Sequence, residues 1–382
     1  MYKIATLNKI SPAGLAHLSD NYTVTENVDE ASAILVRSQD MHEMEFGNTL
    51  LSIARAGAGV NNIPLLDCAD KGIVVFNTPG ANANAVKELL LAGLLLAARN
   101  IPEGISWASG LTENIGKQVE KGKGQFAGHE LKGKTLGVLG LGAIGRLVAN
   151  MAMDLGMNVI GYDPFLSLDA ALGLKPGVKV LPDMKLVLPA CDFVTVHIPA
   201  TDNTKEMLNA DIFSQMKDNA VLLNFSRDKL VNEDDLVAAL EAGKPAKYIT
   251  DFPTDKLLGK KNVISIPHLG ASTAEAEDNC ATMAVEETMD YIENGNIVNS
   301  VNFPTVTLGP KGDLNRIAVI TKFEPYPAKL AMAMFANLNI VSITGAVKGV
   351  YGYALIETPD MVESVPALNE VLRVRVIQPD DM

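Results

Sequence analysis

The chain has 382 residues, and its 45 Asp and Glu residues outnumber its 32 Lys and Arg residues, so the net charge is −13. At roughly 150 residues per domain, this length predicts two or three domains. A content of 48% apolar and 20% charged residues excludes a disordered, collagen-like or disulfide-scaffold chain. An acidic surface binds polyanions poorly, so neither nucleic acid nor an anionic membrane is an expected partner. A basic pocket for a small anion remains open.

The three cysteines, Cys68, Cys191 and Cys280, are too few and too scattered for a disulfide framework or a Cys-rich metal site. No metal is expected, and reduced thiols fit a cytoplasmic protein. The first residues lack the charged-then-apolar pattern of a signal peptide. The most apolar run, 89–98, is too short to span a bilayer and is expected to form a buried core helix.

Short apolar runs alternate with helix-period stretches through about residue 300. This alternation is typical of α/β layering, with parallel strands covered on both faces. The region 105–132 interrupts the pattern because it is polar and rich in Gly and Lys. It is expected to be a surface excursion in which Trp107 packs at a rim, an interpretation favoured over a substrate contact. The expected strands include 34–36, 72–76, 136–139, 159–162, 193–196 and 220–223.

The pattern changes after residue 301, where prolines and glycines mark a linker. The order of elements beyond it, βαββαβ, is that of the ferredoxin-like split motif and predicts a small separate domain. The expected elements are a strand at 316–321, a helix at 328–338, a hairpin at 340–344 and 351–356, a second helix at 362–372 and a strand at 374–377.

A glycine motif, Gly140-Leu141-Gly142-Ala143-Ile144-Gly145, follows the strand expected at 135–139 and opens a helix that stops at Gly156. The next strand, 158–162, ends in Asp163. A glycine motif alone is a weak signal. Strand, motif, helix, strand and terminal acid in this order predict a dinucleotide-binding site.

Each position of the motif has a physical role. Gly140 permits the tight turn, Gly142 lets the backbone approach the pyrophosphate, and Gly145 allows the helix to pack closely on the strand. The helix start, at Ala143 and Ile144, supplies free N–H groups and a positive dipole end. The Asp163 carboxylate would accept hydrogen bonds from the ribose hydroxyls of the adenosine and would repel a 2′-phosphate. This favours NAD over NADP.

Three further segments, 224–227, 250–255 and 267–273, follow expected strands at the edge where open α/β sheets bind ligands. They place Arg227, the acids Asp251 and Asp255, and His268 near a nicotinamide. Oxidation of an alcohol needs a base for the hydroxyl proton, a carboxylate to orient that base, and a cation for the substrate's carboxylate or carbonyl. Taken singly, each of these residues could equally be a surface charge or a loop residue.

Further residues are expected to line the cofactor, namely Ser226 and, on the adenine side, His197 and Pro199. The remaining histidines, His17, His42 and His129, have no such neighbours in the sequence and are expected to be structural.

These segments together resemble the D-2-hydroxyacid dehydrogenase family over residues 1–300. Further motifs in the same order carry the likeness, at 36–38, 54–62, 77–82 and 128–135. The resemblance implies a Rossmann NAD-binding domain, 82–270, inserted in a flavodoxin-like substrate domain, 1–81 and 271–305. It implies catalytic roles for Arg227 and His268, and a homodimer or homotetramer.

The family's acid is a Glu in a Phe-Pro-Thr-Glu-Pro context, whereas this chain has Phe252-Pro253-Thr254-Asp255-Lys256. We expect Asp255 to be the partner of His268 and Asp251 to contact the cofactor. A one-residue gap in the alignment would instead make Asp251 the acid on the nicotinamide side.

By the same resemblance, the backbone N–H groups of Gly57, Ala58 and Gly59 are expected to bind the substrate carboxylate. Candidates for a substrate phosphate are Arg37, Ser38, Arg55 and Asn82, and separate surface arginines are the alternative. These residues would separate a phosphorylated acid from lactate or glyoxylate, and the resemblance implies 3-phosphoglycerate as the small anionic substrate. Other 2-hydroxy acids (glycerate, 2-hydroxyglutarate) and an NAD-sensing corepressor remain alternatives.

The C-terminal segment, 312–382, resembles ACT regulatory domains. Serine-binding members carry a His and an Asn where this chain has Phe323 and Pro325, whose side chains have no polar atom. Strong serine inhibition through this segment is therefore not expected, and the domain would support oligomerisation instead.

Overall fold

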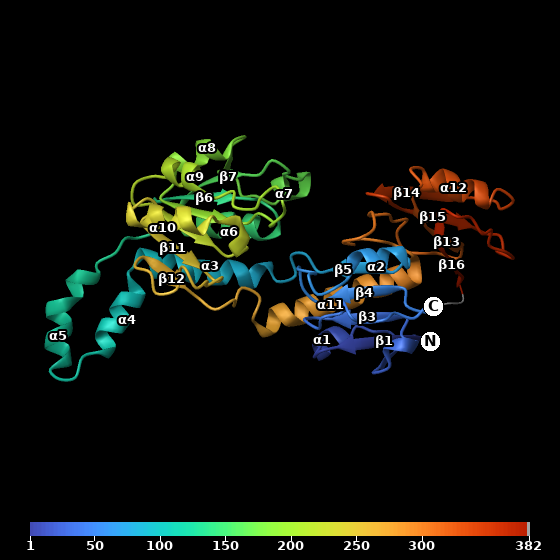
Figure 1. Ribbon diagram of the computed structural model, residues 1–382, viewed down its shortest axis with the longest axis horizontal. Coiled ribbons are helices and arrows are strands. Elements are labelled where there is room, and N and C mark those ends of the chain that lie inside the picture. Colours follow the sequence, from blue (N-terminus) through green and yellow to red (C-terminus); the bar gives the residue numbers. More distant parts are fainter. Residues whose placement is uncertain (380–382) are drawn as a thin grey trace. The chain divides into compact units, whose positions relative to one another are not determined.

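The computed structural model describes residues 1–379 (Figure 1). The chain divides into two compact units. The first contains residues 1–82 and the chain from residue 274 onward, and the second contains residues 83–273. Residues 312–379, expected as a separate domain, therefore belong to the same compact unit as the N-terminal sheet.

The N-terminal sheet of the first unit is fully parallel, with the strand order β2-β1-β3-β4-β5 of flavodoxin-like folds. Its strands β3, β4 and β5 are buried on both faces. In β3, Ala33 and Leu35 pack into one apolar cluster, and Ile34 and Val36 pack into the other. The elements are β1 (Tyr2–Leu7), α1 (Pro12–Leu15), β2 (Tyr22–Thr25), η1 (Val28–Glu30), β3 (Ala33–Val36), β4 (Ser52–Arg55), α2 (Leu65–Asp70), β5 (Val74–Asn77) and α11 (Ala274–Asn294).

The second unit holds a parallel sheet of order β12-β11-β10-β9-β6-β7-β8, which contains the Rossmann arrangement. The strand order reverses between β6 and β9, and ligands bind such sheets at the carboxyl ends beside this point. The strands are β6 (Thr135–Leu139), β7 (Asn158–Tyr162), β8 (Lys179–Val180), β9 (Phe193–Val196), β10 (Val221–Asn224), β11 (Lys247–Thr250) and β12 (Val263–Ser265).

Helices cover both faces of this sheet. One apolar cluster contains α3 and α6 residues, such as Leu90 and Val148, and the cluster on the other face contains Phe213 and Leu236 of α9 and α10. The helices are α3 (Ala83–Ala98), α6 (Ala143–Asp154), α7 (Leu168–Leu172), α8 (Met184–Val187), η3 (Leu188–Ala190), α9 (Ala210–Gln215), η4 (Asp228–Leu230) and α10 (Glu233–Glu241).

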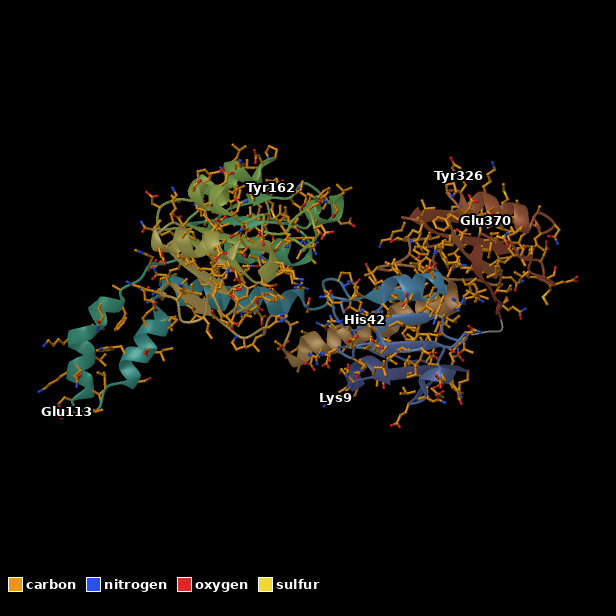
Figure 2. All side chains as sticks on the ribbon, in the orientation of Figure 1. Lys9, His42, Glu113, Tyr162, Tyr326 and Glu370 are labelled. Carbon is orange, nitrogen blue, oxygen red and sulfur yellow. The ribbon has the colours of Figure 1, made fainter. Side chains whose placement is uncertain are left out.

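The expected excursion is a helical arm, residues 101–126, made of α4 (Ile101–Ser109), α5 (Ile115–Gly122) and η2 (Lys123–Phe126). Figure 1 shows α4 and α5 projecting from the sheet layers of the second unit, and Figure 2 labels Glu113 at the turn between them. The Trp107 ring packs on Phe126 with ring centroids 5.3 Å apart, which supports its interpretation as a packing residue.

Within residues 1–379, no single helix has the length and apolar character needed to cross a membrane. Among the described residues, only α3 and α4 taken together have this length and apolar character, and the two helices are bent by 69° relative to each other.

The C-terminal residues form a four-stranded antiparallel sheet of order β14-β15-β13-β16. The second expected helix is wrong, because residues 361–368 have no regular structure and β16 begins at Val371. Pro366 explains the failure, since a proline inside a helix removes a hydrogen bond and clashes with the preceding turn. The elements are β13 (Asn315–Lys322), α12 (Pro327–Met334), β14 (Ser342–Lys348), β15 (Tyr351–Thr358) and β16 (Val371–Ile377).

One face of this C-terminal sheet shares its core with the N-terminal sheet. Ile320 and Tyr353 belong to the apolar cluster that also contains Phe76 of β5. The fully buried Arg316 donates to Glu357 from Nε at 3.0 Å and from Nη2 at 2.7 Å. Its Nη1 donates to the Asn294 carbonyl at the end of α11 at 2.6 Å. The sheet is thereby fixed to the end of α11.

Candidate active site

The glycine loop after β6 has the conformation that its sequence predicts. Gly140 has φ = 91°, a region that favours glycine, and a Cβ there would lie 2.4 Å from the His197 carbonyl oxygen. A Cβ on Gly145 would lie 1.9 Å from the Gly140 oxygen. A Cβ on Gly142 would meet no atom within 4 Å. The first and last glycines are thus required by packing, and the middle one borders open space.

Asp163 lies against this loop, at the end of β7. Its Oδ2 accepts the Leu141 N–H at 2.8 Å, and its Oδ1 accepts the Phe165 N–H at 2.8 Å. His197 follows β9, which pairs with β6 on the side opposite β7. Thr195 Oγ1 lies 3.1 Å from its Nε2, while its Nδ1 is buried without a partner among the described residues. Burial lowers the pKa of His197 to about 3, so its imidazole is neutral.

The other cofactor candidates lie nearby in the same unit. Ser226 Oγ donates to the Val196 carbonyl at 2.7 Å, which ties the loop after β10 to the end of β9. The Pro199 carbonyl accepts the Thr204 hydroxyl at 2.7 Å.

Arg227 lies in the loop after β10 and His268 in the loop after β12. Both side chains lie beside the aromatic ring of Phe252. The Arg227 guanidinium carbon is 5.9 Å from the centroid of this ring, and the His268 ring centroid is 4.5 Å from it. Arg227 Nη1 donates to the Ser226 carbonyl at 2.6 Å. Both polar side chains are exposed. A cation and a histidine therefore stand together at the carboxyl edge of the Rossmann sheet, as expected.

Asp251 is the buried member of this group and is only 1% exposed. Its Oδ2 accepts the Gly270 N–H at 3.2 Å, and its Oδ1 is buried without a partner among the described residues. Burial raises the pKa of the Asp251 carboxyl, and the charges of His268 and Arg227 oppose that rise. Asp251 is thus close enough to His268 for their charges to interact.

Asp255 is expected from the sequence to be the partner of His268, and among the described residues no hydrogen bond or ion pair joins the two. The Asp255 side chain is exposed, and within residues 1–379 it makes no hydrogen bond or ion pair. Asp251 instead is the acid whose charge interacts with His268. Spacing alone leaves the choice open, because Asp255 aligns with the family's acid without a gap, whereas an alignment through Asp251 needs a gap of one residue.

The substrate-side candidates lie in the first unit, at the carboxyl ends of β3 and β4. Arg55 is in register with Val36, and its Nε donates to the Arg37 carbonyl at 3.0 Å. Arg37 Nη2 pairs with Glu277 Oε1 of α11 at 2.7 Å. The two arginines therefore lie side by side, and a carboxylate partly balances their charge.

The loop with Gly57, Ala58 and Gly59 follows β4 directly. The Asn77 side chain donates to the Ala58 carbonyl at 2.6 Å, and the Thr78 N–H donates to the Gly57 carbonyl at 3.2 Å. Asn82 is the last residue of the first unit before the chain enters the second. The residues at the end of β5 therefore bind the carbonyl groups of this loop.

Two residues of these groups were not predicted. Phe252 supplies the ring beside Arg227 and His268, whereas from the sequence it is named only as part of the motif 252–256 and is given no role. Asn8 accepts the backbone N–H groups of Ser38 at 2.9 Å and Gln39 at 2.6 Å. A signal existed for Asn8, because it follows β1, the neighbour of β3 in the sheet.

The residues present fit a dinucleotide. The open space at Gly142, the helix start of α6 and the carboxylate of Asp163 match the pyrophosphate and ribose of such a cofactor. The buried, unpartnered Oδ1 of Asp251 adds an acceptor at the same sheet edge.

Comparison with known proteins agrees with this geometry. Residues 91–270 match the NAD-binding domain of D-isomer specific 2-hydroxyacid dehydrogenases. The chain is 35% identical over 339 residues to a D-3-phosphoglycerate dehydrogenase of Methanocaldococcus jannaschii, covering 85% of this chain and 60% of the relative. It is 33% identical to the Synechocystis enzyme of that name, covering 92% of this chain and 63% of the relative. The chain thus spans about three fifths of these relatives.

Solved structures support the fold. An NAD⁺-bound 3-phosphoglycerate dehydrogenase of Entamoeba histolytica superposes with a TM-score of 0.62, at 24% identity, over 79% of this chain and 98% of that one. Residues 91–270 are thus similar to the NAD-binding domain of D-isomer specific 2-hydroxyacid dehydrogenases, in line with the motifs of this segment.

Proposed function

We propose that the protein oxidises 3-phospho-D-glycerate to 3-phosphohydroxypyruvate with NAD, the first step of L-serine biosynthesis. The observation that carries the proposal is the grouping of Arg227, His268 and a buried acid at the carboxyl edge of an NAD-binding sheet. The relatives named D-3-phosphoglycerate dehydrogenase support the choice of substrate.

The chemistry follows from these side chains. NAD, when bound, accepts the hydride from the substrate's C2. His268 takes the proton of the C2 hydroxyl, because imidazole is the side chain best suited to act as a base near neutral pH. Arg227 binds the carboxylate or the developing carbonyl through its paired N–H donors. Both groups lie beside the ring of Phe252.

We assign the acid that orients His268 to Asp251, with Asp255 as the alternative. The assignment to Asp251 rests on its interaction with the His268 charge and on its bond to the Gly270 N–H. A negative Asp251 stabilises the imidazolium that forms as the proton is taken.

Specificity for a phosphorylated acid is assigned to the first unit. Arg37 and Arg55 supply adjacent cations, Ser38 and Asn82 supply neutral hydrogen-bonding groups, and Gly57, Ala58 and Gly59 supply N–H groups for a carboxylate. Plain lactate or glyoxylate would leave the arginine pair without a phosphate.

The test is an assay of NADH formation with 3-phosphoglycerate, glycerate, lactate and 2-hydroxyglutarate, together with the reverse reaction of the keto acids. We expect 3-phosphoglycerate to have the highest kcat/KM. Activity with glycerate but not with 3-phosphoglycerate would contradict the phosphate assignment. Absence of turnover with every acid would favour the NAD-sensing corepressor.

The C-terminal sheet is proposed to be an ACT-like module without strong serine binding. The strand order agrees with the ferredoxin-like motif, although only one of its two helices is formed. Phe323 is 72% exposed and presents an apolar ring where serine-binding modules carry a histidine.

A further inference from the structure

Glu287 is a partly buried acid of α11 that none of the roles above uses. Its Oε1 accepts the Asn299 Nδ2–H at 2.7 Å, and its Oε2 is buried without a partner among the described residues. A buried carboxylate oxygen with no donor is costly when the group is ionised. The surroundings therefore suit the neutral acid.

A short series of hydrogen bonds joins Glu287 to the loop of Gly57, Ala58 and Gly59. The Asn299 carbonyl accepts the Asn77 N–H at 3.4 Å, and the Asn77 side chain donates to the Ala58 carbonyl at 2.6 Å. A bridge between Phe76 and Ser300 holds the two segments side by side. Asn299 has φ = 56°, a backbone region that asparagine tolerates better than most residues.

The charges around Glu287 do not favour its ionisation. Glu286, the next residue of α11, adds a like charge, and its own carboxylate pairs with His17 at 3.3 Å. From the C-terminal sheet, Lys348 Nζ donates to the Ser300 carbonyl at 2.9 Å rather than to an acid. Burial raises the pKa of Glu287 to about 8, against the opposing effect of the Asn299 hydrogen bond.

We propose that neutral Glu287 is a positioning residue for the loop of Gly57, Ala58 and Gly59, acting through Asn299 and Asn77, and that losing its proton weakens binding of the anionic substrate. This inference rests on the proposed function, which assigns that loop to the substrate carboxylate. An ionised Glu287 would add a negative charge near a site for an anion, with one carboxylate oxygen buried without a donor among the described residues.

The experiment compares the full-length wild type with Glu287→Gln and Glu286→Gln from pH 6.5 to pH 9.5. Glutamine keeps the shape of the neutral acid and cannot ionise. Glu286→Gln removes the same charge from the adjacent, exposed position and serves as the matched control. We expect the KM for 3-phosphoglycerate to rise severalfold above pH 8 in the wild type and in Glu286→Gln, and to stay level in Glu287→Gln. A rise of equal size in Glu287→Gln would overturn the proposal.

A second variant, Glu287→Met, separates the hydrogen bond from the charge. It is neutral but cannot accept from Asn299, so its KM should exceed that of Glu287→Gln at every pH, with kcat changed less than KM. Equal KM values for the two variants would show that the path through Asn299 carries no effect.

Calorimetric titration of 3-phosphoglycerate into the same proteins measures the effect of Glu287 on substrate binding independently of catalysis. A Kd that rises with pH in the wild type and not in Glu287→Gln supports the proposal even if turnover fails. Parallel pH dependence, or no binding by any of the proteins, contradicts it. Absence of turnover alone would contradict the proposed function only.

Discussion

Gly270 donates its backbone N–H to Oδ2 of Asp251 at 3.2 Å, which ties the loop carrying His268 to the end of β11. We therefore expect Asp251→Asn to lower kcat/KM by about 10²-fold or more, the usual scale for an acid–base group. Asp255→Asn, at an exposed position, should have a much smaller effect. Steady-state assays of both variants across pH check this, and the reverse order of effects would restore Asp255 as the partner of His268.

The glycine loop predicts two different outcomes for the same substitution. Gly142→Ala adds a methyl group where nothing lies within 4 Å, so stability should be retained while the KM for NAD rises. Gly145→Ala forces a methyl group to within 1.9 Å of the Gly140 oxygen, so its Tm should fall. Thermal scans with and without NAD distinguish the two. Equal Tm values for both variants would argue against the packing role of Gly145.

Arg55→Gln should raise the KM for 3-phosphoglycerate at least tenfold, because a cation next to a phosphate is lost. The effect on a 2-hydroxy acid without phosphate should be smaller. Arg99→Gln, an exposed arginine of the second unit, is the control for the change in net charge. A similar loss for both acids would mean that Arg55 supports the fold rather than recognising the phosphate.

Glu287 also predicts how stability depends on pH. The folded state holds a proton between the ordinary pKa of 4.5 and the raised value of about 8, whereas the unfolded chain has released it. The free energy of unfolding therefore falls as pH rises through this window, by up to a few kcal/mol for a shift of this size. Urea unfolding at pH 5 and pH 8.5 should show this loss in the wild type and in Glu286→Gln, but less of it in Glu287→Gln. An identical loss in all three proteins would contradict the protonated state.

Arg316→Met should destabilise the first unit by about 3–5 kcal/mol, because it leaves Glu357 partly buried without its cation. Arg316→Met combined with Glu357→Met should recover part of that loss. Urea unfolding monitored by tyrosine fluorescence checks both, and an additive effect of the two substitutions would show that the pair is not coupled.

Much of the scaffold could be predicted from local sequence patterns. Two-sided apolar runs identify strands such as 193–196, and the order of strand, glycines, helix and Asp163 identifies the dinucleotide loop. These features are encoded within a few tens of residues, so no tertiary information is needed. The side-by-side placement of Arg37 and Arg55 also follows, because parallel neighbouring strands end at one edge.

Other features depend on contacts between distant segments. The burial of Asp251 against the Gly270 loop, on which its proposed role rests, depends on packing that spacing along the chain cannot reveal. The second C-terminal helix fails at Pro366 despite apolar residues around it. The burial of Glu287 and Arg316 depends on elements far away in the sequence, so the residues next to them in the chain do not reveal it.

The core shared by the two sheets of the first unit has a consequence for hydrogen exchange. Because Ile320 and Tyr353 fill the same apolar cluster as Phe76, β13 cannot open without exposing the interior under β5. The amide protons of the two strands should therefore exchange through a common opening event. An isolated N-terminal sheet would lose that protection, since part of its apolar interior is supplied by the last seventy residues or so of the chain.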